Sequence, residues 1–167
     1  PNHLLFFESK LRDILKEYRL RRIPPEKDTK ILTDWNCLTI SALSKAAHIL
    51  NNTKYREIAT SSLEWILDNL TKDTEVYHCK QKENNYINGF LNDYAFLIFA
   101  LLNHYITTSN EKYLYKAIKF NNEMFKKIYY NDKLFFTSNY SDNLILQVED
   151  KYDNATPSGL SITYENL

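Results

Sequence analysis

Glycine and proline are scarce in this chain of 167 residues, which has 2 glycines and 4 prolines. Because glycine and proline interrupt helices and mark tight turns, their scarcity favours long helices over a sheet-rich domain. Two of the prolines stand together in "RIPPEKD" (22–28), where tandem proline must end a first helix. The length suffices to bury a substantial core in one domain.

Net charge is also missing, since 21 basic residues balance 21 acidic ones. Nucleic-acid-binding proteins usually carry a basic excess or a basic stripe, so we expect no nucleic-acid partner. The longest apolar run, "YAFLIFALL" (94–102), is shorter than the ~20 residues that span a bilayer, so we expect no membrane partner. The chain opens at Pro1 without a signal-peptide pattern and stops inside an apparent helix, so we expect a piece of a longer protein.

Cysteine is rare as well. Cys37 and Cys79 are the two cysteines, and they form no CxxC pair. Two thiols with no suitably spaced histidine make no zinc site, so the sequence predicts no metal and no cofactor. We expect two buried free thiols in a reducing, cytoplasmic compartment.

The apolar residues have helical spacing over most of the sequence. Apolar residues predict helices at about 4–18, 33–50, 54–70, 91–107 and 111–128. Short alternating stretches predict strands at 76–80, 134–138 and 144–148. The sequence therefore predicts an all-α fold with short strands in its long loops.

The helices repeat in pairs. At an offset of 59 the residues of one helix start match those of another: Leu32, Asp34, Leu38 and Leu43 match Leu91, Asp93, Leu97 and Leu102. At an offset of 58, "NTKY" (52–55) meets "NEKY" (110–113). This indicates helical-hairpin repeats at about 33–80 and 91–138, with a third beginning near 158. Within each pair the chain reverses through a short connection, and a long connection follows the second helix. The chain therefore returns to the same end after each pair, so the first helices should run parallel and start at that end.

Three segments carry a family resemblance. "DTKILTDWNCLTISALSKAA" (28–47), "GFLNDYAFLIFALL" (89–102) and "DNATPSGLSITYENL" (153–167) resemble motifs of the spermatogenesis-associated, thioredoxin-domain-containing proteins. Thr29, Cys37 and Leu160 depart from those motifs. The resemblance implies that residues 1–167 are one domain fragment of an (α/α)6 toroid. It also implies similarity to N-acylglucosamine 2-epimerases and six-hairpin glycosidases, with a thioredoxin-like domain upstream.

Three side chains are candidate catalytic groups. Asp34 and Asp93 stand in the first turns of the matched helices, just after the predicted N-caps Thr33 and Asn92. An acid there complements the helix dipole, which predicts a lowered pKa and is a sufficient structural reason for its presence. His78 is the histidine on a long loop at the same end, and histidine suits proton transfer near neutral pH. We expect Asp93 to be the more functional of the two acids.

Other residues near the same end are candidate substrate-binding groups. Trp35 and Tyr94 offer flat faces to a sugar ring, although large aromatics at helical spacing also suit a core. Asp28 and Lys30 follow the proline break and either pair with each other or border the site. The remaining candidates are Asn36 and Ser158, the latter in "PSG" (157–159), where it also suits a helix cap.

Three functions remain open at this stage. The first is a carbohydrate-handling domain with an epimerase-like or isomerase-like reaction on a sugar or other small molecule. The second is a non-catalytic scaffold for the upstream thioredoxin-like domain, and the third is a glycoside hydrolase, which needs one carboxyl of raised pKa. We also expect self-association, because an incomplete toroid leaves apolar helix faces uncovered.

Overall fold

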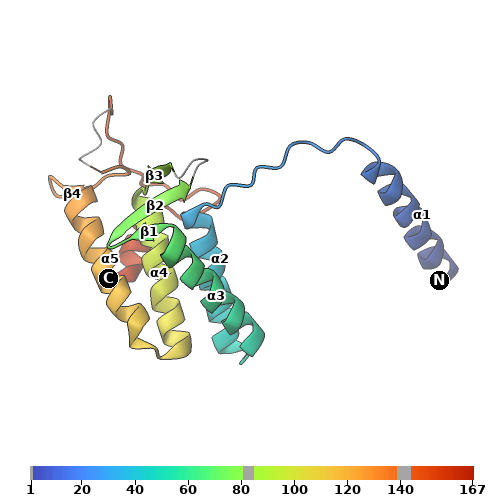
Figure 1. Ribbon diagram of the computed structural model, residues 1–167, viewed down its shortest axis with the longest axis horizontal. Coiled ribbons are helices and arrows are strands. Elements are labelled where there is room, and N and C mark those ends of the chain that lie inside the picture. Colours follow the sequence, from blue (N-terminus) through green and yellow to red (C-terminus); the bar gives the residue numbers. More distant parts are fainter. Residues whose placement is uncertain (1, 81–84, 139–143) are drawn as a thin grey trace.

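The chain is mostly helical, and the all-α prediction is confirmed. Its computed structural model describes residues 2–80, 85–138 and 144–167. The helices within these residues are α1 (Asn2–Leu20), α2 (Thr33–Ile49), α3 (Thr53–Asn69), α4 (Leu91–Thr108), α5 (Glu111–Ile128) and α6 (Gly159–Asn166). Figure 1 shows α2 to α6 gathered into one bundle, with the strands at one end of it.

The strands form two small antiparallel units. β1 (Thr71–Lys72), β2 (Glu75–Lys80) and β3 (Tyr86–Asn88) make one sheet, and β4 (Tyr129–Tyr130) pairs with β5 (Lys133–Leu134). The predicted strand at 76–80 is confirmed, whereas 134–138 is strand only at its first residue. The predicted strand at 144–148 is wrong: this segment joins no described strand, and Ile145 and Leu146 point into solvent. Phe136 N donates to the Val148 carbonyl at 2.8 Å, but one such hydrogen bond does not make a strand ladder.

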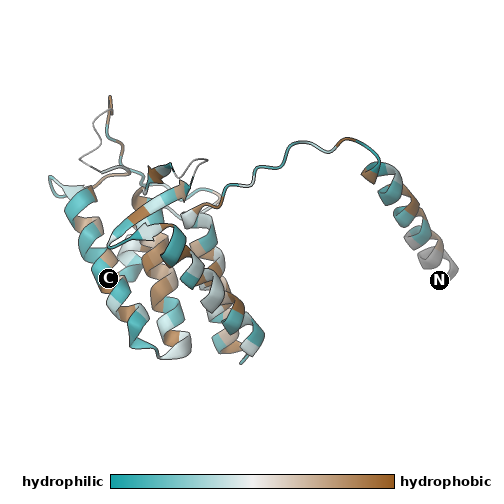
Figure 2. Ribbon diagram, in the orientation of Figure 1, coloured by the Kyte–Doolittle hydropathy of each residue, from teal (hydrophilic) through white to brown (hydrophobic). Residues whose placement is uncertain are grey.

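Helix α4 lies at the centre of the bundle and packs against α2, α5 and α6. Its sequence is apolar at most positions, and Figure 2 shows mostly brown ribbon on the visible side of this helix. Such a helix is stable when it is covered on several sides. Helix α5 is one-sided by contrast. It buries Tyr113, Ala117, Phe120, Met124 and Ile128, which follow one another at spacings of three or four residues.

Helices α2 and α4 run parallel, as the repeat predicts. At their starts, Asp34 N donates to Asp93 Oδ1 at 3.2 Å. Near their ends, Ser44 Oγ lies 3.0 Å from His104 Nδ1, and Thr107 Oγ1 donates to the Ser44 carbonyl at 2.9 Å. Contacts in the same order on both helices require a parallel alignment.

Strand β2 lies across the end of the bundle where α2 and α4 begin. Thr33 Oγ1 donates to the Tyr77 carbonyl at 2.5 Å, which ties the strand to α2. Val76 N donates to the Tyr94 hydroxyl at 3.2 Å, which ties it to α4. Gly89 approaches so closely that a Cβ there would lie 2.6 Å from the Val76 carbonyl oxygen. These contacts hold β2 over the N-termini of α2 and α4. They place the side chain of His78, the residue after Tyr77, above both N-termini.

Helix α1 stands away from the bundle, at the end of the extended segment 21–32 (Figure 1). The apolar residues described on it are exposed. Among the described residues, no helix combines the length and the apolar character that crossing a bilayer requires.

Candidate functional site

The carboxylate of Asp93 joins the first turns of α2 and α4. Its Oδ2 accepts from Phe90 N at 2.9 Å, and its Oδ1 accepts from Asp34 N. The residue is fully buried, at 0% exposure. Both donors are backbone groups at helix N-termini, where the helix dipole stabilises a negative charge. One buried anion therefore fixes how the two helix starts meet.

The N-caps differ from the prediction. Leu32 and Phe90 occupy the cap positions, so Thr33 and Asn92 lie inside their helices and do not cap them. Neither Leu32 nor Phe90 has a capping side chain. Asp93 reaches back to Phe90 N instead, in the manner of the acidic half of a capping box.

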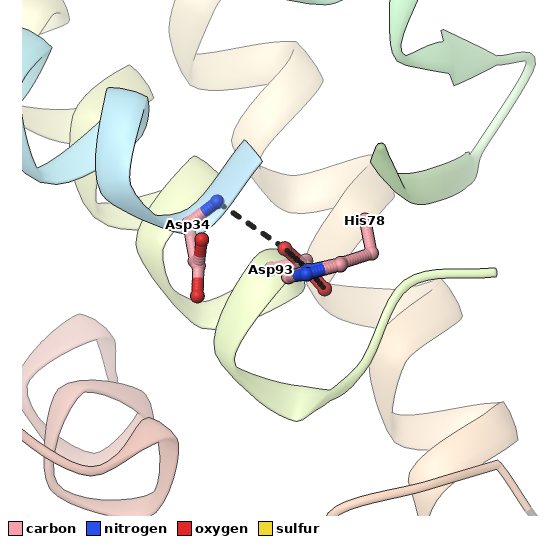
Figure 3. Close-up of side chains that lie close together, drawn as sticks. All are labelled: Asp34, His78 and Asp93. Atoms are coloured by element: carbon pink, nitrogen blue, oxygen red, sulfur yellow. Dashed lines mark hydrogen bonds and ion pairs between the residues drawn. The ribbon is translucent and has the colours of Figure 1, made fainter. Parts of the chain in front are cut away.

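His78 reaches this carboxylate from β2. Its Nδ1 lies 3.0 Å from Asp93 Oδ1 and 3.1 Å from Asp93 Oδ2, as Figure 3 shows. The hydrogen bond to Asp93 raises the pKa of His78, although partial burial opposes that shift. With Nδ1 donating to Asp93, the second ring nitrogen, Nε2, is the one left to meet a ligand. The His78 side chain is 22% exposed, so solvent reaches it while Asp93 stays covered.

Asp34 completes a cluster that we call the Asp34–His78–Asp93 cluster. Its Oδ1 accepts from Trp35 N at 2.7 Å, and the residue is 9% exposed. Burial raises the pKa of Asp34, and the charge of Asp93 raises it further. The sequence predicted a lowered pKa from the helix dipole. That prediction is wrong for Asp34, because desolvation and a neighbouring carboxylate outweigh the first-turn N–H groups.

The same three residues offer metal-ligand atoms, one each, within 4.8 Å of one another. Asp93, however, already accepts two backbone N–H groups and the imidazole Nδ1–H. A metal ion bound through Asp93 and Nδ1 would displace that imidazole proton and compete with the backbone donors. The side chains of Asp34, His78 and Asp93 therefore fit a hydrogen-bonded acid–base cluster better than a metal centre.

Trp35 and Asn36 lie on the outward face of α2, beside the cluster rather than in it. Trp35 is 60% exposed. Asn36 donates from Nδ2 to the Leu32 carbonyl at 2.7 Å and borders a groove of about 420 Å³ between α2 and α3. The structure does not bring the Asn36 amide into the cluster.

Tyr94 and Ser158 have structural contacts. Tyr94 is 2% exposed, its ring belongs to the core, and its hydroxyl accepts from Val76 N. Ser158 is buried at the N-cap of α6, where its Oγ accepts from Ser161 N at 3.1 Å. Its own N–H donates to Asp153 Oδ1 at 2.8 Å. These contacts account for both residues without a ligand.

Asp28 and Lys30 pair with each other. Lys30 Nζ lies 3.3 Å from Asp28 Oδ2, and Lys30 N donates to Asp28 Oδ1 at 3.0 Å. Both side chains are mostly exposed. The sequence left open whether Asp28 and Lys30 pair with each other or border the site, and the structure contains the ion pair.

Phe90 was not identified from the sequence as part of the site, and Thr33 was predicted only as an N-cap. Phe90 supplies a backbone N–H to Asp93, and its ring centroid lies 5.3 Å from that of His78. Thr33 is fully buried and holds the Tyr77 carbonyl next to His78. The repeat gave no signal for Phe90, because the offset of 59 aligns Leu32 with Leu91, one residue further on.

Sequence comparison finds distant relatives, and no protein-family model matches the chain. The uncharacterized protein B0495.5 of Caenorhabditis elegans is 30% identical over 164 residues, which cover 93% of this chain and 22% of that protein. Spermatogenesis-associated protein 20 is 25% identical in Homo sapiens and 26% in Rattus norvegicus, in each case over 92% of this chain and 21% of the relative. The chain thus spans about a fifth of the length of the curated relatives it matches.

One solved structure shares part of the fold. The Lin0763 protein from Listeria innocua superposes with a TM-score of 0.56 and 24% identity. The match covers 61% of this chain and 31% of that protein. At this identity the match supports a shared helical arrangement and says nothing of chemistry.

Proposed function

We propose that this chain is part of a carbohydrate-handling domain in which the Asp34–His78–Asp93 cluster transfers protons on a sugar. One observation carries the proposal: the fully buried Asp93 holds His78 Nδ1 at 3.0 and 3.1 Å. A carboxylate in this position fixes the orientation of an imidazole and leaves its other nitrogen to act on a ligand.

His78 is the proton donor of the proposed pair. Its raised pKa favours the imidazolium more than in an unperturbed histidine. A donor whose pKa lies near the working pH is the effective general acid. Asp93 does not touch the ligand in this scheme, because it is covered on all sides, so it is a positioning residue.

Asp34 is the proposed base. Burial and the nearby Asp93 raise its pKa, and a carboxylate of raised pKa is a stronger base than one in water. The cluster therefore joins an acid and a base whose pKa values are both raised above their ordinary values.

The reaction that suits this pair is a proton shift next to the carbonyl of an open-chain sugar. Asp34 takes the proton from the carbon beside the carbonyl while His78 gives a proton to the carbonyl oxygen, which forms an enediol. Return of a proton to carbon and loss of the hydroxyl proton regenerate a carbonyl sugar. The product is an epimer or an isomer, according to the face and the carbon that receive the proton.

The helical hairpins support the wider part of the proposal. We place the chain in an (α/α)6 toroid, with hairpins at about 33–80 and 91–138 and a third beginning near 158, in a longer cytoplasmic protein with a thioredoxin-like domain upstream. The parallel α2 and α4, and the similarity to spermatogenesis-associated protein 20, are consistent with that placement.

Solvent exchange tests the chemistry. The chain is incubated in D2O with a panel of N-acylhexosamines, aldoses and ketoses, and proton NMR follows loss of the signal beside the carbonyl. We expect deuterium incorporation that falls at least about tenfold in His78→Gln and in Asp34→Asn. The matched controls His48→Gln and Asp68→Asn alter exposed residues outside the cluster and should exchange at the wild-type rate. Exchange that is absent in the wild type, or equal in all five proteins, would refute the proposal.

Glycoside hydrolysis is a second candidate, favoured by the raised pKa of Asp34, which suits a general acid. The fully buried Asp93 opposes it, since the second carboxylate of a hydrolase must reach the sugar or a water. Release of nitrophenol from aryl glycosides by the wild type, lost in Asp34→Asn, would favour this reaction over proton exchange.

A further inference from the structure

An apolar stripe runs along the described part of α1, and its side chains are exposed among the residues that the structure describes. The exposed side chains of this stripe are Phe7, Leu11, Ile14, Leu15 and Tyr18. Their spacings of four, three, one and three residues put them on one side of the helix. A single helix of this length is marginal in water, and most helices gain their stability by burying such a face. The α1 stripe therefore needs a surface to cover it.

A matching surface lies on the bundle, along α3. Its groove of about 420 Å³ is lined by Ile31, Asn36, Ser61, Ser62, Trp65 and Ile66. Trp65 and Ile58, on the same side of α3, are large apolar residues with about two-fifths of their surface exposed. Ile31 belongs to the segment that connects α1 to α2, so the groove begins where that segment ends.

The internal repeat indicates what kind of element covers this groove. Helix α3 is the second helix of its hairpin, and it contacts α5, the second helix of the next hairpin, through Glu64, which accepts from Lys112 Nζ at 2.7 Å and from the Tyr113 hydroxyl at 2.7 Å. At the offset of 58, Lys112 and Tyr113 correspond to Lys54 and Tyr55 on α3.

Ile58, Ser62 and Trp65 continue along α3 from Lys54 at spacings of four, four and three residues, so all four share one flank. This flank is the α3 counterpart of the α5 surface that receives α3. By this correspondence the flank suits the second helix of a preceding hairpin. Helix α1 precedes α2 in the chain and is therefore the helix in that position.

We propose that the groove beside Trp65 binds the α1 stripe of a second copy of this chain, in a reciprocal exchange that forms a dimer. Residues 23–31 belong to no helix or strand and include Pro24 and Pro25, which favour extended backbone in the pair and in the residue before it. The segment holds α1 away from its own bundle in Figure 1. Exchange keeps this extended connection, whereas docking onto the same bundle requires it to reverse. Such exchange is a common route to dimers.

The surface involved is large enough for a stable dimer. If each large exposed side chain contributes about 100 Å², the five residues of the stripe present roughly 500 Å² on α1, and Ile31, Ile58 and Trp65 present roughly 300 Å² on the groove side. Reciprocal docking doubles the total to roughly 1,600 Å², above the ~1,200 Å² of the smallest stable interfaces. This inference does not depend on the chemistry proposed for the Asp34–His78–Asp93 cluster.

Cross-linking between two differently sized copies tests the occupant. One copy carries Leu11→Cys, near the middle of α1, and a copy with a mass tag carries Ser62→Cys, near the middle of α3. The native Cys37 and Cys79 are buried and serve as the unreactive background. We expect a short bismaleimide to join the two copies when they are mixed. Cross-linking confined to a single chain that carries both substitutions would overturn the proposal in favour of docking within one copy.

Sedimentation velocity gives an independent measure. The wild type should pass from monomer to dimer as its concentration rises, and Leu11→Ser with Leu15→Ser should raise the dimer Kd at least about tenfold. The matched control, Asp13→Ser with Lys16→Ser, alters the opposite side of α1 and should leave the Kd unchanged. Circular dichroism checks that both variants keep their helix content. A wild type that stays monomeric at every concentration, or equal Kd values for stripe and control variants, would also overturn the proposal.

Discussion

Replacement of Asp93 by asparagine is the sharpest perturbation of the cluster. Asp93→Asn keeps the size of the side chain but removes its charge and one acceptor oxygen. In the wild type that carboxylate accepts from Phe90 N, from Asp34 N and from His78 Nδ1. The amide NH2 of asparagine must face at least one of these donors, so a buried donor loses its partner.

The expected cost follows from these contacts. Breaking a buried ion pair by neutralising one partner costs about 3–5 kcal/mol, and the 22% exposure of His78 favours the lower end of that range. We expect the free energy of unfolding to fall by about 3 kcal/mol. In a chain of this length the melting temperature should fall by roughly 6–12 °C.

The pH dependence of this loss identifies the partner. The pKa of His78 is raised in the folded state, so its pairing with Asp93 stabilises the fold fully below the unfolded pKa of about 6.5. That contribution is lost as the pH rises through the folded pKa. The difference between wild type and Asp93→Asn should therefore be largest near pH 6 and become smaller as the pH rises towards 9, because the imidazolium charge is lost while the hydrogen bonds to Asp93 can remain.

Urea unfolding at both pH values measures the difference, and NMR titration follows the His78 ring. The His78 pKa should fall in Asp93→Asn, because its largest raising contact is gone. Asp68→Asn, on the exposed side of α3, is the matched control and should stay within about 0.5 kcal/mol of wild type. A loss below about 1 kcal/mol at pH 6 would refute the reasoning, since it would make Asp93 no more than a partner of the helix dipole.

Three further predictions concern the supports of the bundle. Burial lowers the pKa of His104, so the contribution of this residue to stability is present above pH 6.5 and is lost as the pH falls through the folded pKa. In urea unfolding at pH 7 and pH 5, His104→Gln should therefore lose less stability on acidification than wild type. Tyr94→Phe leaves the buried Val76 N–H without its hydroxyl partner and should lower the free energy of unfolding by about 1–3 kcal/mol by the same assay. Gly159→Ala puts a Cβ 2.3 Å from Asn92 Oδ1 and 3.0 Å from Asn92 N, and calorimetry should show a destabilisation of about 1–3 kcal/mol.

The helices were predictable because their signal is local. The helix predicted at 91–107 is α4, Leu91–Thr108, and the helix predicted at 111–128 is α5 with the same bounds. Apolar spacing, with almost no glycine or proline to interrupt it, is sufficient for such elements. The strand predicted at 144–148 failed for the opposite reason, since a strand exists only where a second segment pairs with it.

The cluster was predictable in part. The offset of 59 placed Asp34 and Asp93 at matching helix starts, and the structure joins them through a hydrogen bond between those two residues. The loop position of His78 put it at the same end. Tyr94 matched Trp35 in the repeat, yet Tyr94 is in the core and Trp35 is in solvent, because α4 has neighbours on more sides than α2.

The sequence by itself determined the helices, their pairing into hairpins and the end of the bundle at which the acids meet, since all three depend on spacing along the chain. The tertiary structure alone decided which acid is covered, which is in contact with His78 and in which direction the pKa of Asp34 moves. A pKa depends on desolvation and on charges within a few ångströms. Here those charges come from α2, β2 and α4, which only the packing of the bundle brings together.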